Sequence, residues 1–316
     1  MEAAQYLEVL PVRFFLRACG PIRFPAISPG IVVRGALGDA FRKSVCPQGC
    51  LRPLECPERD GCPYFRLFRP RAASAPSGFV YSPCAFVLRT HQLAGRLFER
   101  GELFHFDLHL FEKWPQALGR LLAALRRLAD EGIGRLRSRF QLEDVCMLDE
   151  SGAVAGSLGA GRSLCVATPP GWLRLPLDPG REPASFVAVR FLSPTELKHG
   201  GRVVEFHDFK IFLSRILGRL SLLQSRYGRS PLRLDFKAML ERAACVRLCS
   251  LAVQPLYGQR HSSRTGQTHP LGGLLGVAEF EGDVTEFVPY LKAACWTGVG
   301  RHASWGHGAI ALEIRR

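Results

Sequence analysis

The chain has 316 residues, 47% hydrophobic and 22% charged, a composition typical of globular proteins that excludes a disordered chain. Its 42 Lys and Arg against 28 Asp and Glu give a net charge of +14. This charge favours a polyanionic partner, and nucleic acid before a membrane, over the alternative of a basic protein without such a partner. The absence of any apolar run of about 18 residues excludes a membrane helix, and 11 cysteines, an odd number, do not fit a secreted disulfide framework, so we expect a cytoplasmic protein with reduced thiols.

The first half of the chain predicts four strands and two helices. The strands are short runs rich in β-formers, and the helices place leucines at a spacing of three to four residues. In chain order we expect a strand over 7–16, a helix over 31–45, strands over 79–88 and 103–111, a helix over 114–131 and a strand over 140–148.

The second half repeats this order after a Gly-, Pro- and Ser-rich stretch over 151–183, which we interpret as a hairpin and a connection. We expect a strand over 186–192, a helix over 208–227, strands over 248–256 and 274–280, a helix over 284–295 and a strand over 310–314. The fold class is therefore α+β, with two tandem ferredoxin-like (RRM-like) β-α-β-β-α-β domains over 1–180 and 181–316. Four-stranded sheets of this kind often bind RNA.

A cysteine-rich insert over 46–63 follows the first helix. Its four thiols have the spacing Cys46-x3-Cys50-x5-Cys56-x5-Cys62, with prolines and glycines between them. Tetrahedral zinc needs four such ligands on a tightly turning backbone, so we predict a structural Zn²⁺ site. An iron–sulfur cluster and free thiols are the alternatives.

A glycine-rich loop over 298–308 precedes the last strand. It contains four glycines, an arginine, two histidines and a tryptophan. Open backbone amides, a cation and stacking rings suit a phosphodiester backbone with unpaired bases. We therefore predict RNA contacts by Gly298, Gly300, Ser304, Trp305, Gly306 and Gly308.

The same loop offers residues for metal-free RNA cleavage. His302 and His307 are candidates for the base that removes the 2′-OH proton and the acid that protonates the leaving 5′-oxygen. Arg301 is placed to stabilise the charged phosphorane. The alternative is that both histidines only bond to backbone or phosphate.

Two further basic segments are candidates for RNA contact. Lys198, His199 and Arg202 form a turn between a predicted strand and helix, where a phosphate contact is favoured over catalysis. Arg260 and Arg264 belong to a basic loop that begins at Tyr257, for which an ordinary solvated loop is the alternative.

Three motifs together resemble the CRISPR repeat-processing endoribonucleases of the repeat-associated mysterious protein superfamily. One opens the first predicted helix, Arg34-Gly35-Ala36-Leu37-Gly38-Asp39-Ala40-Phe41. Another is His269-Pro270-Leu271-Gly272-Gly273-Leu274-Leu275-Gly276, which leads into Phe280-Glu281-Gly282-Asp283. The third is the glycine-rich loop itself.

The resemblance implies a protein that binds the stem-loop of a precursor CRISPR RNA repeat. Members cut on the 3′ side of the stem without a catalytic metal and leave a 2′,3′-cyclic phosphate and a 5′-hydroxyl. Many retain the mature guide RNA and join the other subunits of an interference complex. The resemblance also implies an RNA contact by Arg34.

One position departs from the family. Members that align here often carry the general base, a histidine, four residues after the position of Gly35, whereas this chain has Asp39 there and no histidine before His91. Three alternatives follow. The acid–base role has moved to His302, His199 or His307, or arginine and lysine residues position the RNA for cleavage without an acid–base residue. In the third alternative the protein is an inactive RNA-binding subunit. A backbone subunit that coats guide RNA is a further alternative.

Overall fold

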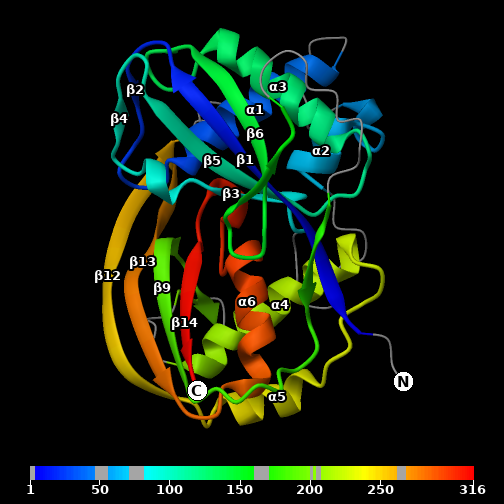
Figure 1. The fold of residues 1–316 in the computed structure, drawn as a ribbon, viewed down its shortest axis with the longest axis vertical. Coiled ribbons are helices and arrows are strands. Elements are labelled where there is room, and N and C mark those ends of the chain that lie inside the picture. Colours follow the sequence, from blue (N-terminus) through cyan, green and yellow to red (C-terminus); the bar gives the residue numbers. More distant parts are fainter. Residues whose placement is uncertain are drawn as a thin grey trace. The chain divides into compact units, whose positions relative to one another are not determined.

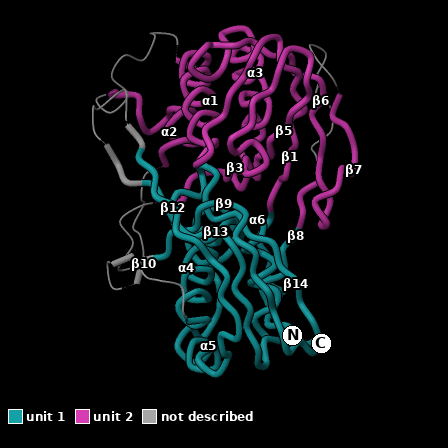
Figure 2. The backbone as a smooth tube through the Cα atoms, turned by 90° about the vertical axis from the view of Figure 1, so that its left-hand side faces the viewer, with its two compact units in different colours: residues 1–8, 174–316 teal, residues 9–173 magenta. Residues whose placement is uncertain are grey.

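The computed structural model describes residues 4–46, 56–70, 82–159, 171–199, 202–203, 208–261 and 268–316. The chain forms two compact units (Figure 2), one over residues 9–173 and one that joins residues 1–8 to residues 174–316. The sequence placed the boundary near 180 and did not assign the first eight residues to the second unit. We call these the N-terminal unit and the C-terminal unit.

The N-terminal unit contains a mixed sheet-and-helix fold. Its elements are β1 (Tyr6–Ala18), β2 (Ile22–Arg23), α1 (Gly30–Val45), α2 (Pro63–Phe68), β3 (Phe86–Arg89), β4 (Leu97–Phe98), β5 (Leu103–Leu110), α3 (Ala117–Glu131), β6 (Phe140–Leu148) and β7 (Val154–Ser157). The strand order is β3-β5-β1-β6-β7, and neighbouring strands are antiparallel. This is the β-α-β-β-α-β order that the sequence predicts, with β7 added at one edge.

Helix α3 buries its apolar face, and α1 buries Leu37 and Phe41 while Val45 at its end is half-buried. The apolar face of α3 consists of Leu118, Leu121, Leu122, Leu125 and Leu128, each at most 5% exposed. An ion-pair network ties the two helices together, because Lys43 Nζ lies 2.9 Å from a carboxylate oxygen of Asp39 on α1 and 2.9 Å from one of Glu131 on α3.

The C-terminal unit repeats the arrangement. Its elements are β8 (Leu173–Pro176), β9 (Phe186–Thr195), β10 (Lys198–His199), β11 (Arg202–Val203), α4 (Phe209–Tyr227), α5 (Phe236–Ala243), β12 (Arg247–His261), β13 (Thr268–Glu281), α6 (Val288–Thr297) and β14 (Ile310–Arg315). The sheet order is β12-β13-β9-β14, again antiparallel throughout, and β8 pairs with β1 (Figure 1).

Helix α4 forms the core of this unit with the sheet. Asp208 caps its N-terminus by accepting a 2.7 Å hydrogen bond from the Lys210 backbone N–H, which satisfies one of the donors left open at a helix start. The Phe209 ring lies 5.1 Å from that of Phe280 on β13 and 5.4 Å from that of Phe287. Apolar spacing in the sequence therefore gave the correct helix and the correct buried face.

Several elements differ from the prediction. The short helices α2 and α5 were not predicted, because six and eight residues are too few to show a helical period clearly. The hairpin of β12 and β13 extends to His261 and Thr268, so the segment from Tyr257 to His261, predicted as a loop, is strand. In the described part of the chain, no helix combines the length and apolar character that spanning a membrane requires.

Candidate functional site

The glycine-rich loop connects α6 to β14 and lies against β9. Gly298 ends α6 with a φ of 75°, and the Val299 N–H donates to the Gly308 carbonyl at 2.9 Å, which closes the loop. The Gly308 N–H donates to the Pro194 carbonyl on β9 at 3.0 Å. The loop is therefore a fixed part of the C-terminal unit.

The amides of three of the four glycines are already occupied. The Gly298, Gly306 and Gly308 N–H groups donate to the carbonyls of Ala294, Ala303 and Pro194 at 2.8, 3.1 and 3.0 Å. In this structure these three amides hold the path of the backbone, and the RNA contact expected of their glycines stays a prediction.

Two glycines allow contacts that no side chain would permit. A Cβ at Gly300, where φ is 73°, would lie 2.3 Å from the Glu196 carbonyl oxygen. A Cβ at Gly308, where φ is 68°, would lie 1.9 Å from the Val299 carbonyl oxygen. Both positions combine a left-handed backbone with a close approach, which is the situation that selects glycine.

Arg301 is the exposed residue of the loop, and His302, Ser304 and Trp305 are half-buried. His302 has a φ of 62°, which is uncommon for a residue with a side chain. Its carbonyl accepts hydrogen bonds from the N–H groups of Trp305 (2.7 Å) and His307 (3.4 Å). The His302 and Trp305 rings are stacked, with centroids 4.8 Å apart and planes inclined by 15°. The stack and the backbone hydrogen bonds hold His302 half-buried in the loop, with its Nε2 covered by protein.

His307 lies inside the C-terminal unit, with no exposed surface. Burial lowers the pKa of its imidazole to about 4, although the negative charge of Glu196 opposes that shift. Its ring meets that of His302 edge to face at 5.8 Å. In this structure His307 packs inside the loop, and its candidate role in proton transfer stays a prediction.

We expect the burial of His307 to make the loop sensitive to acid. Between pH 6.5 and 4 the unfolded chain takes up a proton that the folded loop excludes, so the free energy of opening falls as pH decreases, by up to about 3 kcal/mol. Hydrogen exchange of the Val299 and Gly308 amides, corrected for intrinsic rates, should therefore accelerate between pH 6.5 and 4. A His307→Gln variant should lose this dependence, and equal pH slopes in the two proteins would contradict the assignment.

Glu196 is a site residue that the sequence analysis missed. Its carboxylate accepts a 2.7 Å hydrogen bond from the Arg301 guanidinium, and its carbonyl accepts one from the Arg301 N–H at 3.2 Å. The Glu196 side chain is 10% exposed and that of Arg301 46%. Arg301 is thus held in place and its charge is partly balanced. No sequence signal marked Glu196, because it is 105 residues from its partner.

The other basic candidates are only partly described. Lys198 and His199 of β10 pair with Val203 and Arg202 of β11, so the predicted basic turn is a small hairpin. The side chains of Lys198, His199, Arg202 and Arg260 are outside the described residues, as is the whole of Arg264. Their proposed contacts stay predictions.

The long hairpin explains the second motif of the sequence. Gly273 and Gly276 belong to β13 and have φ values of 145° and 128°. A Cβ at Gly273 would lie 2.5 Å from the Thr195 nitrogen on β9, and one at Gly276 would lie 2.1 Å from the Ala252 carbonyl oxygen on β12. These glycines therefore allow β13 to fit between its two neighbours.

The motif on α1 has a structural role in the N-terminal unit. The Arg34 guanidinium donates to the Phe68 carbonyl at 2.9 Å and so caps the end of α2. Burial opposes ionisation of Asp39, but hydrogen bonds from Lys43 and Arg42 outweigh it and lower the pKa of its carboxyl. A carboxylate with a lowered pKa is a weak proton acceptor, so Asp39 is a poor substitute for a histidine base.

The predicted zinc ligands lie at the ends of local elements. Cys46 follows α1, Cys56 precedes a 3₁₀ turn over Pro57–Arg59, and Cys62 precedes α2. All three are half-buried free thiols, a donor set that suits zinc. Cys50 is outside the described residues, and within the described ranges no three His, Cys, Asp or Glu side chains are grouped to hold a metal. The zinc site stays a prediction.

Comparison with known proteins identifies the C-terminal unit. Residues 189–310 match the family model of the CRISPR-associated endoribonuclease Cas6, and residues 7–163 match a family model described as an N-terminal domain. No curated protein sequence matches the chain.

Solved structures share the fold over nearly the whole chain. A Cas6 of Thermus thermophilus is 14% identical, with a TM-score of 0.52 over 98% of this chain and 100% of that one. A Cas6 product complex is 18% identical, with a TM-score of 0.53 over 97% and 99%. A partial Cas6-RT-Cas1–Cas2 complex is 13% identical, with a TM-score of 0.55 over 98% of this chain and 46% of that one. Residues 189–310 therefore carry a domain that matches the CRISPR-associated endoribonuclease Cas6 family, and the chain shares the fold of the solved Cas6 structures.

Proposed function

We propose that this protein cuts the repeat of precursor CRISPR RNA next to the exposed side of the glycine-rich loop, without a catalytic metal. The 2′-oxygen attacks the adjacent phosphorus, the bond to the 5′-oxygen breaks, and the products end in a 2′,3′-cyclic phosphate and a 5′-hydroxyl. His302 removes the 2′-OH proton or protonates the leaving oxygen, and Arg301 and Lys198 stabilise the phosphorane.

The observation that carries this proposal is the conformation of His302. It is the half-buried histidine of the loop, in a left-handed backbone conformation held by two hydrogen bonds and a ring stack. Such a conformation is costly for a residue with a side chain and is found most often where function requires it. Trp305 beside it offers an aromatic surface for an unpaired base.

Arg301 contributes through its position as well as its charge. Glu196 holds one end of its guanidinium at 2.7 Å, while 46% of the side chain is exposed and can meet a phosphate. A guanidinium held in place suits the phosphorane, because its N–H groups can donate to two phosphate oxygens at once. We propose that the product RNA stays bound and that further CRISPR subunits join it, in line with the Cas6-RT-Cas1–Cas2 complex of similar fold.

Incubation of the protein with its cognate repeat hairpin in excess EDTA tests the function. The expected result is one cut, with a cyclic phosphate on the 5′ fragment, that is abolished by a single 2′-deoxy substitution at the mapped cut site. Tight binding with intact RNA would instead assign the chain to the inactive repeat-binding subunits.

We propose a structural zinc held by Cys46, Cys50, Cys56 and Cys62. With four thiolate ligands the metal would have no open position and would serve only to hold the insert together. Elemental analysis should find about one zinc per chain and no matching iron, and Cys56→Ser should lower that content. A well-folded preparation without metal would contradict the site, while Cys249→Ser is a control that should not alter the zinc content.

A further inference from the structure

Three segments that are far apart in the sequence meet at one place on the C-terminal unit. They are the first residues of β1, strand β8 and the turn after α4. Figure 1 shows the start of β1 beside β8, across the helices from β12. Tyr6 and Glu8 are alternate residues of β1 and share one face of that strand, where Arg174 of β8 and Arg229 of the turn lie against them.

Backbone hydrogen bonds hold these segments together. The Gln5 N–H donates to the Asp178 carboxylate at 2.9 Å, and the Leu177 N–H donates to the Gln5 carbonyl at 2.8 Å. The Gln5 side chain accepts from the Arg233 N–H at 2.7 Å, and the Gln224 side chain donates to the Tyr6 carbonyl at 3.3 Å. The position of Tyr6 is therefore fixed by the fold.

Two arginines share the Tyr6 ring. Their guanidinium carbons lie 4.9 Å (Arg174) and 5.8 Å (Arg229) from the ring centroid, within the range of a cation–π interaction. Each Nε lies 3.8 Å from a different carboxylate oxygen of Glu8, whose side chain is only 10% exposed. The Arg174 and Arg229 side chains are 65% and 69% exposed. The buried carboxylate thus orients two guanidinium groups that remain open to solvent.

The chemistry of this cluster matches single-stranded RNA. Guanidinium forks bind phosphates at two points, and their flat faces accept unpaired bases by stacking. The cluster is positive, because Arg174, Arg229 and the neighbouring Arg233 outnumber the carboxylates of Glu8 and Asp178. A duplex would offer phosphates but no free base faces, so the aromatic ring and the guanidinium groups beside it favour a strand without pairing.

We propose that Tyr6, Arg174 and Arg229 bind a single-stranded segment that flanks the repeat hairpin, through two phosphates and a stacked base. This contact rests on the proposed function for the identity of the RNA. It adds affinity for long precursors and has no part in the chemical step.

The test compares the affinity for two RNAs, the repeat hairpin alone and the hairpin with a twelve-nucleotide uridine extension on its 5′ or its 3′ side. We expect one extension to tighten binding by about tenfold in the wild type, and this gain to be absent in the Arg174→Ala/Arg229→Ala variant. The slope of log affinity against log salt for the extended RNA should become shallower by about 1.4, the value for two phosphates of a single strand. Cleavage of the short hairpin should stay at the wild-type rate.

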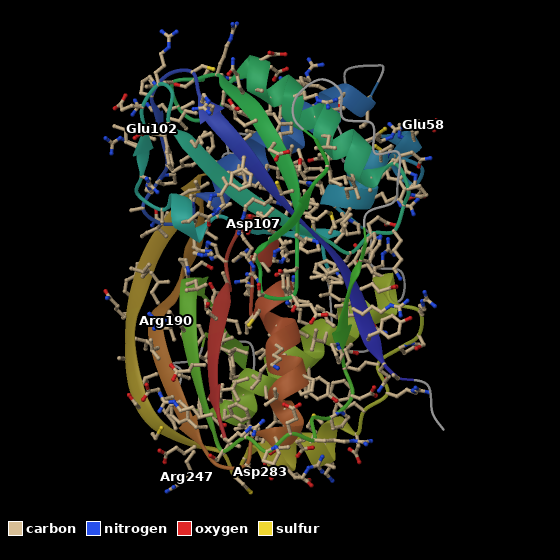
Figure 3. All side chains as sticks on the ribbon, in the orientation of Figure 1. Glu58, Glu102, Asp107, Arg190, Arg247 and Asp283 are labelled. Carbon is tan, nitrogen blue, oxygen red and sulfur yellow. The ribbon has the colours of Figure 1, made fainter. Side chains whose placement is uncertain are left out.

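A matched control removes two positive charges from elsewhere on the same unit. Lys237→Ala/Arg247→Ala changes side chains on α5 and at the start of β12, and Figure 3 shows Arg247 at that end of the sheet. This variant should keep the gain from the extension. If both double variants lost the gain in affinity equally, the effect would be one of net charge alone. If neither extension tightened binding to the wild type, the proposed contact would be refuted. A further measurement separates failure of this contact from failure of the proposed function. Even if the protein cuts no hairpin, a free uridine dodecamer should bind the wild type more tightly than the Arg174→Ala/Arg229→Ala variant.

Discussion

Replacement of His302 by Asn is expected to slow single-turnover cleavage of the repeat hairpin by about 10²-fold or more, the scale of general acid–base catalysis. Asn tolerates the left-handed backbone found here, at a φ of 62°, and keeps polarity, but it cannot exchange a proton at neutral pH. The affinity for the hairpin should change little. Rapid-quench kinetics with enzyme in excess, together with a binding isotherm, measure the two effects separately.

Two further variants distinguish catalysis by His302 from a packing role. His302→Gly also accommodates the backbone and leaves a space beside Trp305, so added imidazole should restore part of its cleavage rate. His199→Asn is the matched control on the basic hairpin. An unchanged rate in His302→Asn combined with a large loss in His199→Asn would move the acid–base role to the hairpin.

Replacement of Gly308 by Ala is expected to destabilise the C-terminal unit by about 2–4 kcal/mol, from backbone strain and a steric clash together. The new Cβ would lie 1.9 Å from the Val299 carbonyl oxygen, a backbone atom that the loop cannot move without breaking its closing hydrogen bond. For a unit of this size the thermal midpoint should fall by about 10 °C, measured by calorimetry.

The control for this prediction is Gly119→Ala on α3. That glycine is exposed in the first turn of the helix, and a Cβ there meets nothing within 4 Å. Alanine should therefore raise stability by up to about 1 kcal/mol, because it is the better helix former. A Gly308→Ala protein as stable as the wild type would show that the loop can adopt another path, and would contradict the role given to this glycine.

Local patterns in the sequence predicted most of the fold. A helical period records which face meets the core. The five leucines named for α3 are accordingly buried, as are six apolar residues of α4, namely Phe209, Phe212, Leu213, Ile216, Leu217 and Leu220. The strands β1, β5, β6, β9 and β14 begin and end within two or three residues of their predicted limits. The limits of β12 and β13 were missed because their outer parts pair only with each other, so burial places little restriction on their residues.

The candidate site was predicted less completely. The glycine-rich loop was found from its composition, but composition does not show which side of a loop faces solvent. His302 and His307 are five residues apart and equivalent by type, yet one is half-buried and the other has no exposed area. Glu196 and the arginine–tyrosine cluster depend on contacts across more than 100 residues, which no local pattern records.

The sequence by itself determined the repeated order of elements, the basic charge and the resemblance to Cas6 proteins, because each depends on composition, periodicity or a contiguous motif. Only the tertiary structure decided what each glycine and each charged group does. The amides of Gly298, Gly306 and Gly308 donate to carbonyls of the protein. The Arg301 guanidinium donates to the carboxylate of Glu196, which follows β9. The physical reason is that hydrogen bonds, burial and ion pairs belong to the folded surroundings of a residue, and those surroundings come from segments distant in the chain.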